Sequence, residues 1–319
     1  MTWRPLTALL LALVTNFAVA ADYPVRPITF VVPWGAGGGT DSVARIIASV
    51  MERDLGKPIN VVNRTGGSGV VGHAAIATAK PDGYTIGMVT TEIGMMHHQG
   101  LTQLTGASFT ALGLVNYDPT AIQVRTDAPY KTIKDLFDAI RANPGKLKAS
   151  GTAQGGSWHV SLCGLLNQQK IPPNAVVWVP SASNAAGLLD LVAGGVDFVP
   201  GSHPEGRSLI DAGKVRSLVV FADEPSKLYP SVPTGAKELG VHWDIGAWRG
   251  IGAPKNLPKD IEARLQAAVK KAYDSKEYQD FMNQRGFGLR WAGPKDFATY
   301  MEETDKEMGK VMKEVGLAK

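Results

Sequence analysis

Ser157 and His159 are the two residues of this 319-residue chain whose types and spacing could suggest nucleophilic catalysis. A hydrolase also needs a third group that orients the histidine, and the sequence identifies no such group. The chain lacks a Gly-x-Ser-x-Gly elbow, a phosphate loop closed by lysine, metal-spaced cysteine pairs and a His-Glu-x-x-His helix. The sequence therefore predicts no catalytic residues and a protein that is not an enzyme.

The adjacent residues His97 and His98 are the strongest candidates for metal ligands, because imidazole suits several transition metals. Such a pair more often lies in a solvated loop, so we expect no metal site. Cys163 is the single cysteine, which excludes an internal disulfide.

The glycines at 67, 69 and 72 fit the spacing of a dinucleotide-binding loop, with Glu92 twenty residues after the last of them. We consider this match formal, because a chain exported from the cytoplasm does not meet nicotinamide cofactors. No cofactor is predicted.

A glycine-rich loop between a strand and a helix is the most informative stretch. A β-branched run at 28–32 leads to Trp34 and the glycines 37–39, and Thr40 and Asp41 then open a helical pattern. Such a loop leaves main-chain N–H groups free to bind an anion beside the positive end of a helix dipole. The alternative is a turn in which glycine supplies only backbone freedom.

This strand–loop–helix design occurs four times, with loops at 33–40, 63–69, 151–157 and 180–183. Strands that alternate with helices predict an α/β fold of mainly parallel sheets, in which ligands bind beyond the carboxyl ends of the strands. If two sheets face each other, these loops can face one cleft. The first, third and fourth loops contain no Lys or Arg, so main-chain N–H groups and hydroxyls would bind an anion there, which suits a small carboxylate.

Local signals predict individual helices. Thr132 is placed to cap a helix at 133–142, and Gly194 follows a predicted helix at 184–193. After residue 257 the pattern predicts amphipathic helices, at 261–272, 277–284 and 297–315.

Trp34 and Trp158 lie on opposite glycine-rich loops. They either pack beneath their loops or flank an apolar or aromatic ligand, and packing is the commoner role of large aromatic residues. Trp243 and Trp248 are predicted to be structural. Glu92 is the one acidic side chain on a predicted cleft loop; it either meets a ligand amine or faces water, and we favour water.

The N-terminus has the pattern of a secretory signal peptide: a short positive region, an apolar stretch at 6–14 and a small-residue cleavage site at 18–20. Removal of residues 1–20, which include Arg4, leaves 32 of the 33 basic residues against 29 acidic ones. The charge is spread along the chain, so nucleic acid is not a predicted partner. A mature chain of this length favours two domains.

The order and spacing of several motifs resemble the Bug family of tripartite tricarboxylate transporter (TctC-type) extracytoplasmic solute receptors over essentially all of the mature chain. The matching residues are Tyr23-Pro24-x-Arg26-Pro27-Ile28, Gly37-Gly38-Gly39-Thr40-Asp41, Asn63-Arg64, Pro81-Asp82-Gly83-Tyr84-Thr85, Gly213-Lys214-Val215-Arg216 and Trp248-x-Gly250. The family's usual Tyr-Lys-Gly after the fourth strand is Ser181-Ala182-Ser183 here, and its frequent Asp is Gly201.

The resemblance implies a two-domain type II periplasmic binding protein (Venus flytrap), with domain I at 21–123 plus 247–319 and domain II at 124–246. It implies a small organic acid gripped between the two lobes, with a hinge near residues 123 and 246. The ligand-binding residues would then be Trp34, Gly37, Gly38, Gly39, Thr40, Asp41, Thr90 and Glu92 on one side, and Ala153, Gly156, Ser157, Trp158, Ser181 and Ser202 on the other.

We therefore predict a monomeric, periplasmic solute-binding protein that captures a small organic carboxylate for the permease subunits of a tripartite tricarboxylate-type transporter. Dicarboxylates, tricarboxylates, aromatic acids and acidic amino acids all remain open as ligands. Two alternatives are a sensor receptor that signals to a histidine kinase and, less favoured, a periplasmic enzyme.

Overall fold

The computed structural model describes residues 23–319, so the predicted signal peptide lies outside the described residues. Two sheets form the framework. The first contains β1 (Ile28–Val32), β2 (Ile59–Asn63), β3 (Thr85–Thr90), β4 (Phe109–Asp118), β10 (Ala247–Pro254) and β11 (Leu289–Ala292) in the order β11-β4-β10-β3-β1-β2. The second contains β5 (Ala121–Arg125), β6 (Lys148–Ser150), β7 (Val177–Val179), β8 (Phe198–Gly201) and β9 (Val215–Val220) in the order β7-β6-β8-β5-β9.

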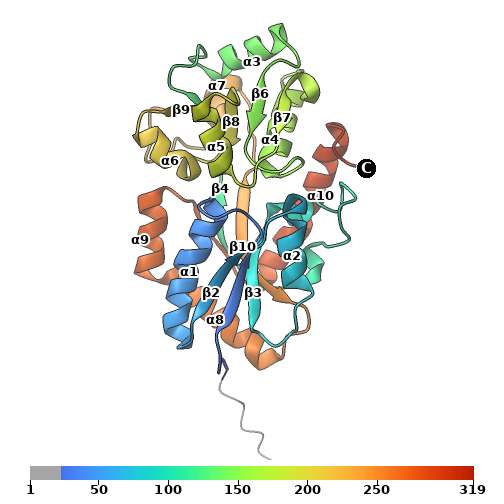
Figure 1. The fold of residues 1–319 in the computed structure, drawn as a ribbon, viewed down its shortest axis with the longest axis vertical. Coiled ribbons are helices and arrows are strands. Elements are labelled where there is room, and N and C mark those ends of the chain that lie inside the picture. Colours follow the sequence, from blue (N-terminus) through green and yellow to red (C-terminus); the bar gives the residue numbers. More distant parts are fainter. Residues whose placement is uncertain (1–22) are drawn as a thin grey trace, which may run out of the picture.

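Helices surround each sheet and give the molecule two lobes, one below and one above in Figure 1. The first lobe carries α1 (Gly39–Leu55), α2 (Val70–Ala77), α8 (Lys259–Asp274), α9 (Lys276–Arg285) and α10 (Pro294–Glu314). The second lobe carries α3 (Ile133–Ala142), α4 (Ser157–Gln168), α5 (Asn184–Ala193), α6 (His203–Asp211) and α7 (Gly235–Leu239). In the described part of the chain, no helix combines the length and apolarity needed to cross a membrane.

Both sheets are mixed, and most strands of each run in one direction, in agreement with the predicted mainly parallel sheets. The strand β1 pairs in parallel with β2 and β3, whereas β10 is antiparallel to β3 and β4. Likewise β6 is parallel to β7 and β8, whereas β5 is antiparallel to β8 and β9. The strands β5 and β10 enter their sheets from the other lobe, so no helical crossover fixes them parallel to their neighbours.

Apolar burial and local caps explain why these elements form. The first core packs the buried faces of α1 and α8 against the first sheet, and the second core packs α3 and α4 against the second sheet. The helix α3 begins at a reciprocal cap, in which Thr132 accepts the Asp135 N–H and Asp135 accepts the Thr132 N–H.

The chain passes between the lobes twice. It leaves β4 and enters β5 through Pro119 and Thr120, close to the predicted hinge residue 123, and returns through residues 240–246 to β10. The Thr120 hydroxyl donates to the Ile245 carbonyl, so the two crossing segments are hydrogen-bonded to each other.

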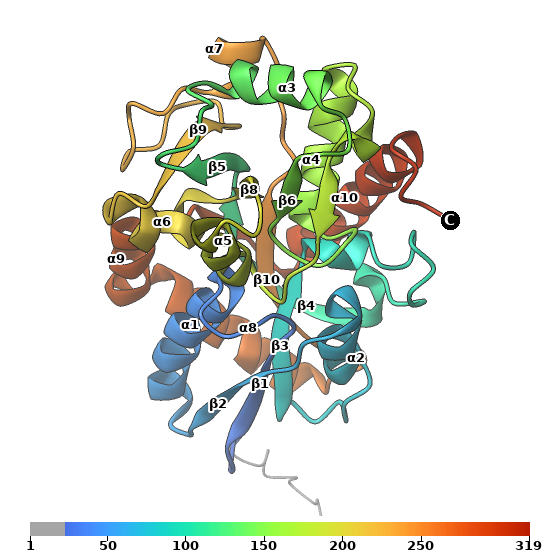
Figure 2. The same cartoon turned by 45° about the horizontal axis from the view of Figure 1, so that its top comes forward.

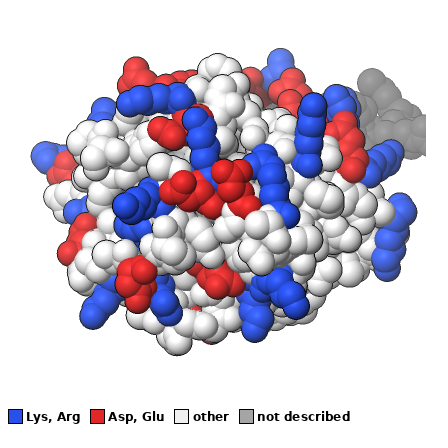
Figure 3. Space-filling view, turned by 90° about the horizontal axis from the view of Figure 1, so that it is seen from above, with Lys and Arg blue, Asp and Glu red and all other residues white. Residues whose placement is uncertain are grey.

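The C-terminal helix α10 (red in Figure 2) lies alongside both lobes. Near its end, Met308 and Met312 form an apolar cluster with Met95 of the first lobe and Val160 on α4 of the second. On the face seen from above in Figure 3, basic and acidic side chains are interspersed.

Candidate ligand site between the lobes

The loop before α1 is held by a buried carboxylate. Gly38 is the N-cap of α1, and the Gly37 N–H donates to Asp41 Oδ2 at 3.0 Å. Asp41 also accepts hydrogen bonds from Arg45 and Asn63. Burial alone would raise the pKa of Asp41, but the hydrogen bonds from Arg45, Gly37 and Asn63 hold this pKa below its ordinary value. Asp41 thus fixes the shape of the loop.

A buried histidine organises the end of β3. His73 Nδ1 donates to the Gly69 carbonyl at 2.8 Å, and its Nε2 accepts the Thr90 N–H at 3.2 Å. This pairing fixes the neutral tautomer, in line with burial, which lowers the pKa of His73. The Thr90 hydroxyl accepts the Trp34 indole N–H at 3.2 Å and donates to Glu92 Oε2 at 2.6 Å.

Glu92 is only 4% exposed, which corrects the expectation that it faces water. Its Oε1 accepts the main-chain N–H of Ser157 at 3.1 Å. Ser157 is the first residue of α4, so a carboxylate of the first lobe lies at the positive end of a second-lobe helix. Sequence spacing could not reveal this burial, because the partner lies on the other lobe.

Other hydrogen bonds also join the predicted loops across the lobes. The Gly35 N–H donates to the Ala182 carbonyl at 3.2 Å, and the Gln99 side chain donates to the Gly155 carbonyl at 3.1 Å. The glycine-rich loops therefore face one another, and the structure is closed.

A small cavity of about 20 Å³ remains between these loops in the closed structure. Residues from both lobes line it: Trp34, Gly38, Gly39, Thr40, Thr90, Glu92, Ala247, Trp248 and Arg249 from the first lobe, and Thr152, Ser157, Trp158, Ser183, Asn184 and Glu205 from the second. The starts of α1, α4 and α5 all reach this cavity, so three helix N-termini converge on it.

The cavity brings together eight of the residues selected from the sequence: Trp34, Gly38, Gly39, Thr40, Thr90, Glu92, Ser157 and Trp158. The other selected residues do not line it: Gly37, Asp41, Ala153, Gly156, Ser181 and Ser202. The Ser181 hydroxyl instead donates to the Ser183 carbonyl, and the Ser202 hydroxyl donates to Glu205, each at 3.0 Å.

Sequence reasoning did not select seven of the lining residues: Thr152, Ser183, Asn184, Glu205, Ala247, Trp248 and Arg249. Thr152 and Ser183 lie in loops that the sequence did identify. Arg249 occupies the unspecified position of the Trp248-x-Gly250 motif, so attention to that position could have found it. Glu205 forms a capping box with Ser202 at the start of α6, a local pattern that predicts a helix start but not a position in the cavity.

Arg249 is the central charge of the site and is 2% exposed. Its guanidinium forms an ion pair with Asp118 and donates to Asn116 within the first lobe. It also donates to the Thr40 hydroxyl at 3.1 Å and reaches Glu205 of the second lobe at 3.3 Å. Burial raises the pKa of Glu205, and the Arg249 charge opposes that rise only in part.

Ser157 and His159 do not form a catalytic pair. His159 Nδ1 accepts the Gly155 N–H at 2.9 Å, and its ring packs 4.5 Å from that of Trp178. Burial lowers the pKa of His159 to about 4. No hydrogen bond joins the Ser157 hydroxyl to His159, although the structure describes both residues.

Two lobes with mixed sheets, two crossing segments and a cavity at the interface define the class of type II periplasmic binding proteins. The chain belongs to the TctC family, described as "Tripartite tricarboxylate transporter family receptor", whose model matches residues 43–317.

Similar proteins agree with this assignment. The "UPF0065 protein in tcbD-tcbE intergenic region" of Pseudomonas sp. (strain P51) is 30% identical over 310 residues, which cover 95% of this chain and 91% of the relative. MatC from Rhodopseudomonas palustris with bound malate is a solved structure with 28% identity and a TM-score of 0.83, covering 91% of this chain and 99% of that one. R. palustris Rpa4515 with adipate has 26% identity and a TM-score of 0.84, and the match covers 93% of this chain and 99% of that one.

Proposed function

We propose that this chain captures a small organic acid between its lobes, where the small cavity of the closed structure must widen to admit the ligand. It would then present the acid to the permease subunits of a tripartite tricarboxylate-type transporter, without catalysing a reaction. The observation that carries the proposal is the convergence of the N-termini of α1 and α5 on one cavity, beside that of α4, whose Ser157 N–H already donates to Glu92. Helix N-termini offer free N–H groups and a partial positive charge to an anion. The similarity to structures that contain malate and adipate supports the same ligand class.

The charges of the cavity favour some acids over others. Glu92 and Glu205 line it, and the one cationic lining residue, Arg249, is already paired with Asp118. A tricarboxylate would bring three further negative charges close to these buried acids, at an energetic cost. We therefore favour a small acid with one or two carboxylates that also carries a hydroxyl or ammonium group, because Glu92 can accept a further hydrogen bond.

Closure would follow rotation of domain I relative to domain II, with the first boundary at Pro119 and Thr120 instead of the predicted residue 123, because all of β5 pairs within the second sheet. We propose that the two crossing segments form the hinge, since the described chain passes from one sheet to the other through them. Ligand contacts from both lobes would then favour the closed state. Cleavage after Ala20 would release a monomeric protein into the periplasm.

A thermal-shift screen tests the proposal. The mature chain is heated with malate, aspartate, adipate, citrate and benzoate, and at least one acid is expected to raise the melting temperature by mass action. The rise should be largest for malate and aspartate, smaller for adipate and smallest for citrate. If no acid at millimolar concentration raises the melting temperature, the proposal is wrong.

A variant that crowds the cavity supplies the specificity test. A side chain at Gly38 would meet Ser183 Cβ at 3.2 Å, so Gly38→Val should abolish the ligand-dependent rise. Gly293→Val is the matched control, since no atom lies within 4 Å of a Cβ there. Equal ligand responses of Gly38→Val and wild type would exclude this cavity as the binding site.

A receptor that signals to a histidine kinase is the alternative role. It would bind the same ligand through the same cavity, so binding data do not separate the two. Genes for permease subunits or for a kinase beside this one would do so.

A further inference from the structure

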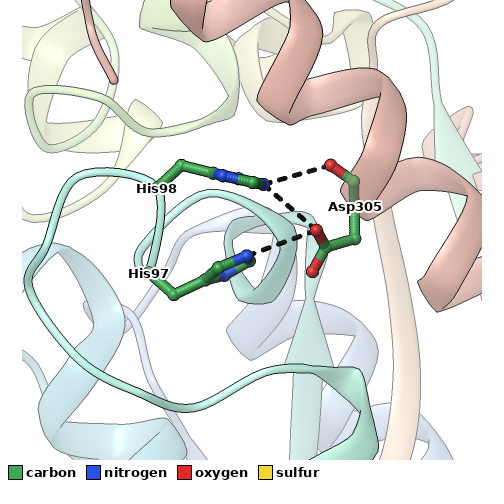
Figure 4. A group of neighbouring side chains, drawn as sticks. All are labelled: His97, His98 and Asp305. Carbon is green, nitrogen blue, oxygen red and sulfur yellow. Dashed lines mark hydrogen bonds and ion pairs between the residues drawn. The ribbon is translucent and has the colours of Figure 1, made fainter. Parts of the chain in front are cut away.

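Two histidines and one carboxylate converge outside the ligand cavity. His97 and His98 follow the 3₁₀ turn η2 (Thr91–Gly94), and Asp305 lies on α10. Figure 4 shows both imidazole rings with their Nε2 atoms directed at the Asp305 carboxylate. The distances to Asp305 Oδ1 are 3.2 Å from His97 Nε2 and 3.1 Å from His98 Nε2.

We propose that His97, His98 and Asp305 bind one divalent transition-metal ion, with Zn²⁺ the first candidate. Two imidazole nitrogens and a carboxylate oxygen are ligands that Zn²⁺ accepts at about 2.0–2.2 Å. Neighbouring ligand atoms of a tetrahedral zinc lie about 3.3 Å apart at such bond lengths. The N···O separations in the cluster are close to that value, and all three ligand atoms lie within 4.8 Å of one another. Small movements would admit the ion.

The surrounding chain holds the ligands in place. Gly309 on α10 leaves room for the His98 ring, because a Cβ there would lie 2.5 Å from its Cε1 atom. The Lys319 N–H donates to the His98 carbonyl at 2.9 Å. Such packing reduces the ordering that metal binding would otherwise require.

The cluster is open enough to exchange an ion with solvent. The side chains of His97, His98 and Asp305 are 20%, 22% and 20% exposed. Three protein ligands leave a fourth position for water, so the site would resemble an accessible one more than a closed structural one.

The position suggests what the ion would do. Residues 97 and 98 continue the segment that carries Glu92, and the next residue, Gln99, donates to the Gly155 carbonyl of the second lobe. A metal ion would therefore fasten the cleft-lining segment to α10. Metal binding at this cluster would be the same whichever acid the cavity holds.

Calorimetric titration with ZnCl₂ tests the site on mature, chelator-treated protein. We expect one ion per chain, and a fall in affinity of roughly 100-fold or more for His98→Ala and for Asp305→Asn. Asp305→Asn keeps the size of the side chain, so it separates loss of a ligand from loss of folding. His242→Ala, at an exposed histidine, is the matched control and should bind Zn²⁺ as wild type does.

Cobalt gives an independent readout, because the absorption of Co²⁺ in the visible range reports its ligand geometry. A tetrahedral spectrum in the wild type that is lost in His98→Ala would support the site. No Zn²⁺ binding at millimolar concentration would overturn the proposal, as would equal affinities of wild type, His98→Ala and Asp305→Asn.

Discussion

The carboxylate of Glu92 accepts the main-chain N–H of Ser157 at 3.1 Å, across the interface between the two lobes. A side chain of the protein thus occupies the N-terminus of α4, one of the three helix ends that reach the cavity. A bound acid must either use the N-termini of α1 and α5 or displace Glu92. The first arrangement leaves Glu92 as an acceptor for a donor group of the ligand.

Replacement of Glu92 should therefore change ligand preference. Gln at this position keeps an oxygen for the Ser157 N–H but removes the charge. We expect Glu92→Gln to weaken binding of a hydroxy or amino acid by about 10–100-fold, since a hydrogen bond to a charged group contributes about 1.5–3 kcal/mol. Binding of adipate should weaken less. Titration calorimetry with both acids measures the difference, and an equal change for both would contradict the proposed role.

Gly39 should be required for full closure. A Cβ there would lie 2.5 Å from Arg249 Nη2 and 2.8 Å from Glu205 Oε1. Glu205 belongs to the second lobe, and Arg249, held by Asp118, has little freedom to make room. Gly39→Ala should therefore separate the lobes and weaken ligand binding by about tenfold or more. Small-angle scattering should show a larger radius of gyration than in Gly293→Ala, the control. Identical scattering and ligand affinity in Gly39→Ala and Gly293→Ala would refute the requirement for Gly39 in closure.

The buried charge of Arg249 should matter for stability. Arg249→Met leaves Asp118 and Glu205 buried without a cation, and loss of one partner of a buried ion pair costs about 3–5 kcal/mol. Arg249→Lys should recover only part of the lost stability, because one ammonium group cannot reproduce the contacts of the guanidinium. Urea unfolding measures the free energies. A change below about 1 kcal/mol for Arg249→Met would contradict the assigned role.

Acid should destabilise the fold partly through His159. Its folded pKa of about 4 lies below the unfolded value of about 6.5, so the unfolded chain binds the proton more readily. Stability is therefore highest above pH 6.5 and falls as the pH drops towards 4, by up to ~3 kcal/mol from this group.

His159→Asn isolates that contribution, because the Asn oxygen can still accept the Gly155 N–H but does not titrate. Urea unfolding at pH 7 and pH 4.5 should show a smaller loss of stability for His159→Asn than for wild type. His242→Ala should follow wild type. Parallel pH profiles of His159→Asn and wild type would disprove the assignment.

Helices whose ends carry capping residues could be predicted from the sequence. The helices at 133–142 and 184–193 were predicted with the bounds that α3 and α5 have, and Thr132, Ser183 and Gly194 cap them. The strands β4 and β10 were not predicted, although both lie inside the first sheet. Their glycines, among them Gly113 and Gly250, interrupt the apolar alternation on which strand prediction depends.

The glycine-rich loops predicted segments that meet at the cavity between the lobes, because free N–H groups at helix starts are a sequence-level signal. The charged residues were harder to predict. Arg249 and Glu205 meet across the interface between the lobes, as do Glu92 and Ser157. Such pairings depend on tertiary placement, which single-sequence patterns do not encode.

The cluster of Met95, Met308 and Met312 at the junction of α10 and α4 bears on the ease of lobe movement. Thioether side chains are unbranched and can change rotamer while they keep their van der Waals contacts. Neighbouring surfaces can then slide by small distances without exposing apolar area to water. The contact between α10 and α4 could then adjust gradually as the cleft between the lobes opens. Repeated capture and release of solute would not require this contact to break.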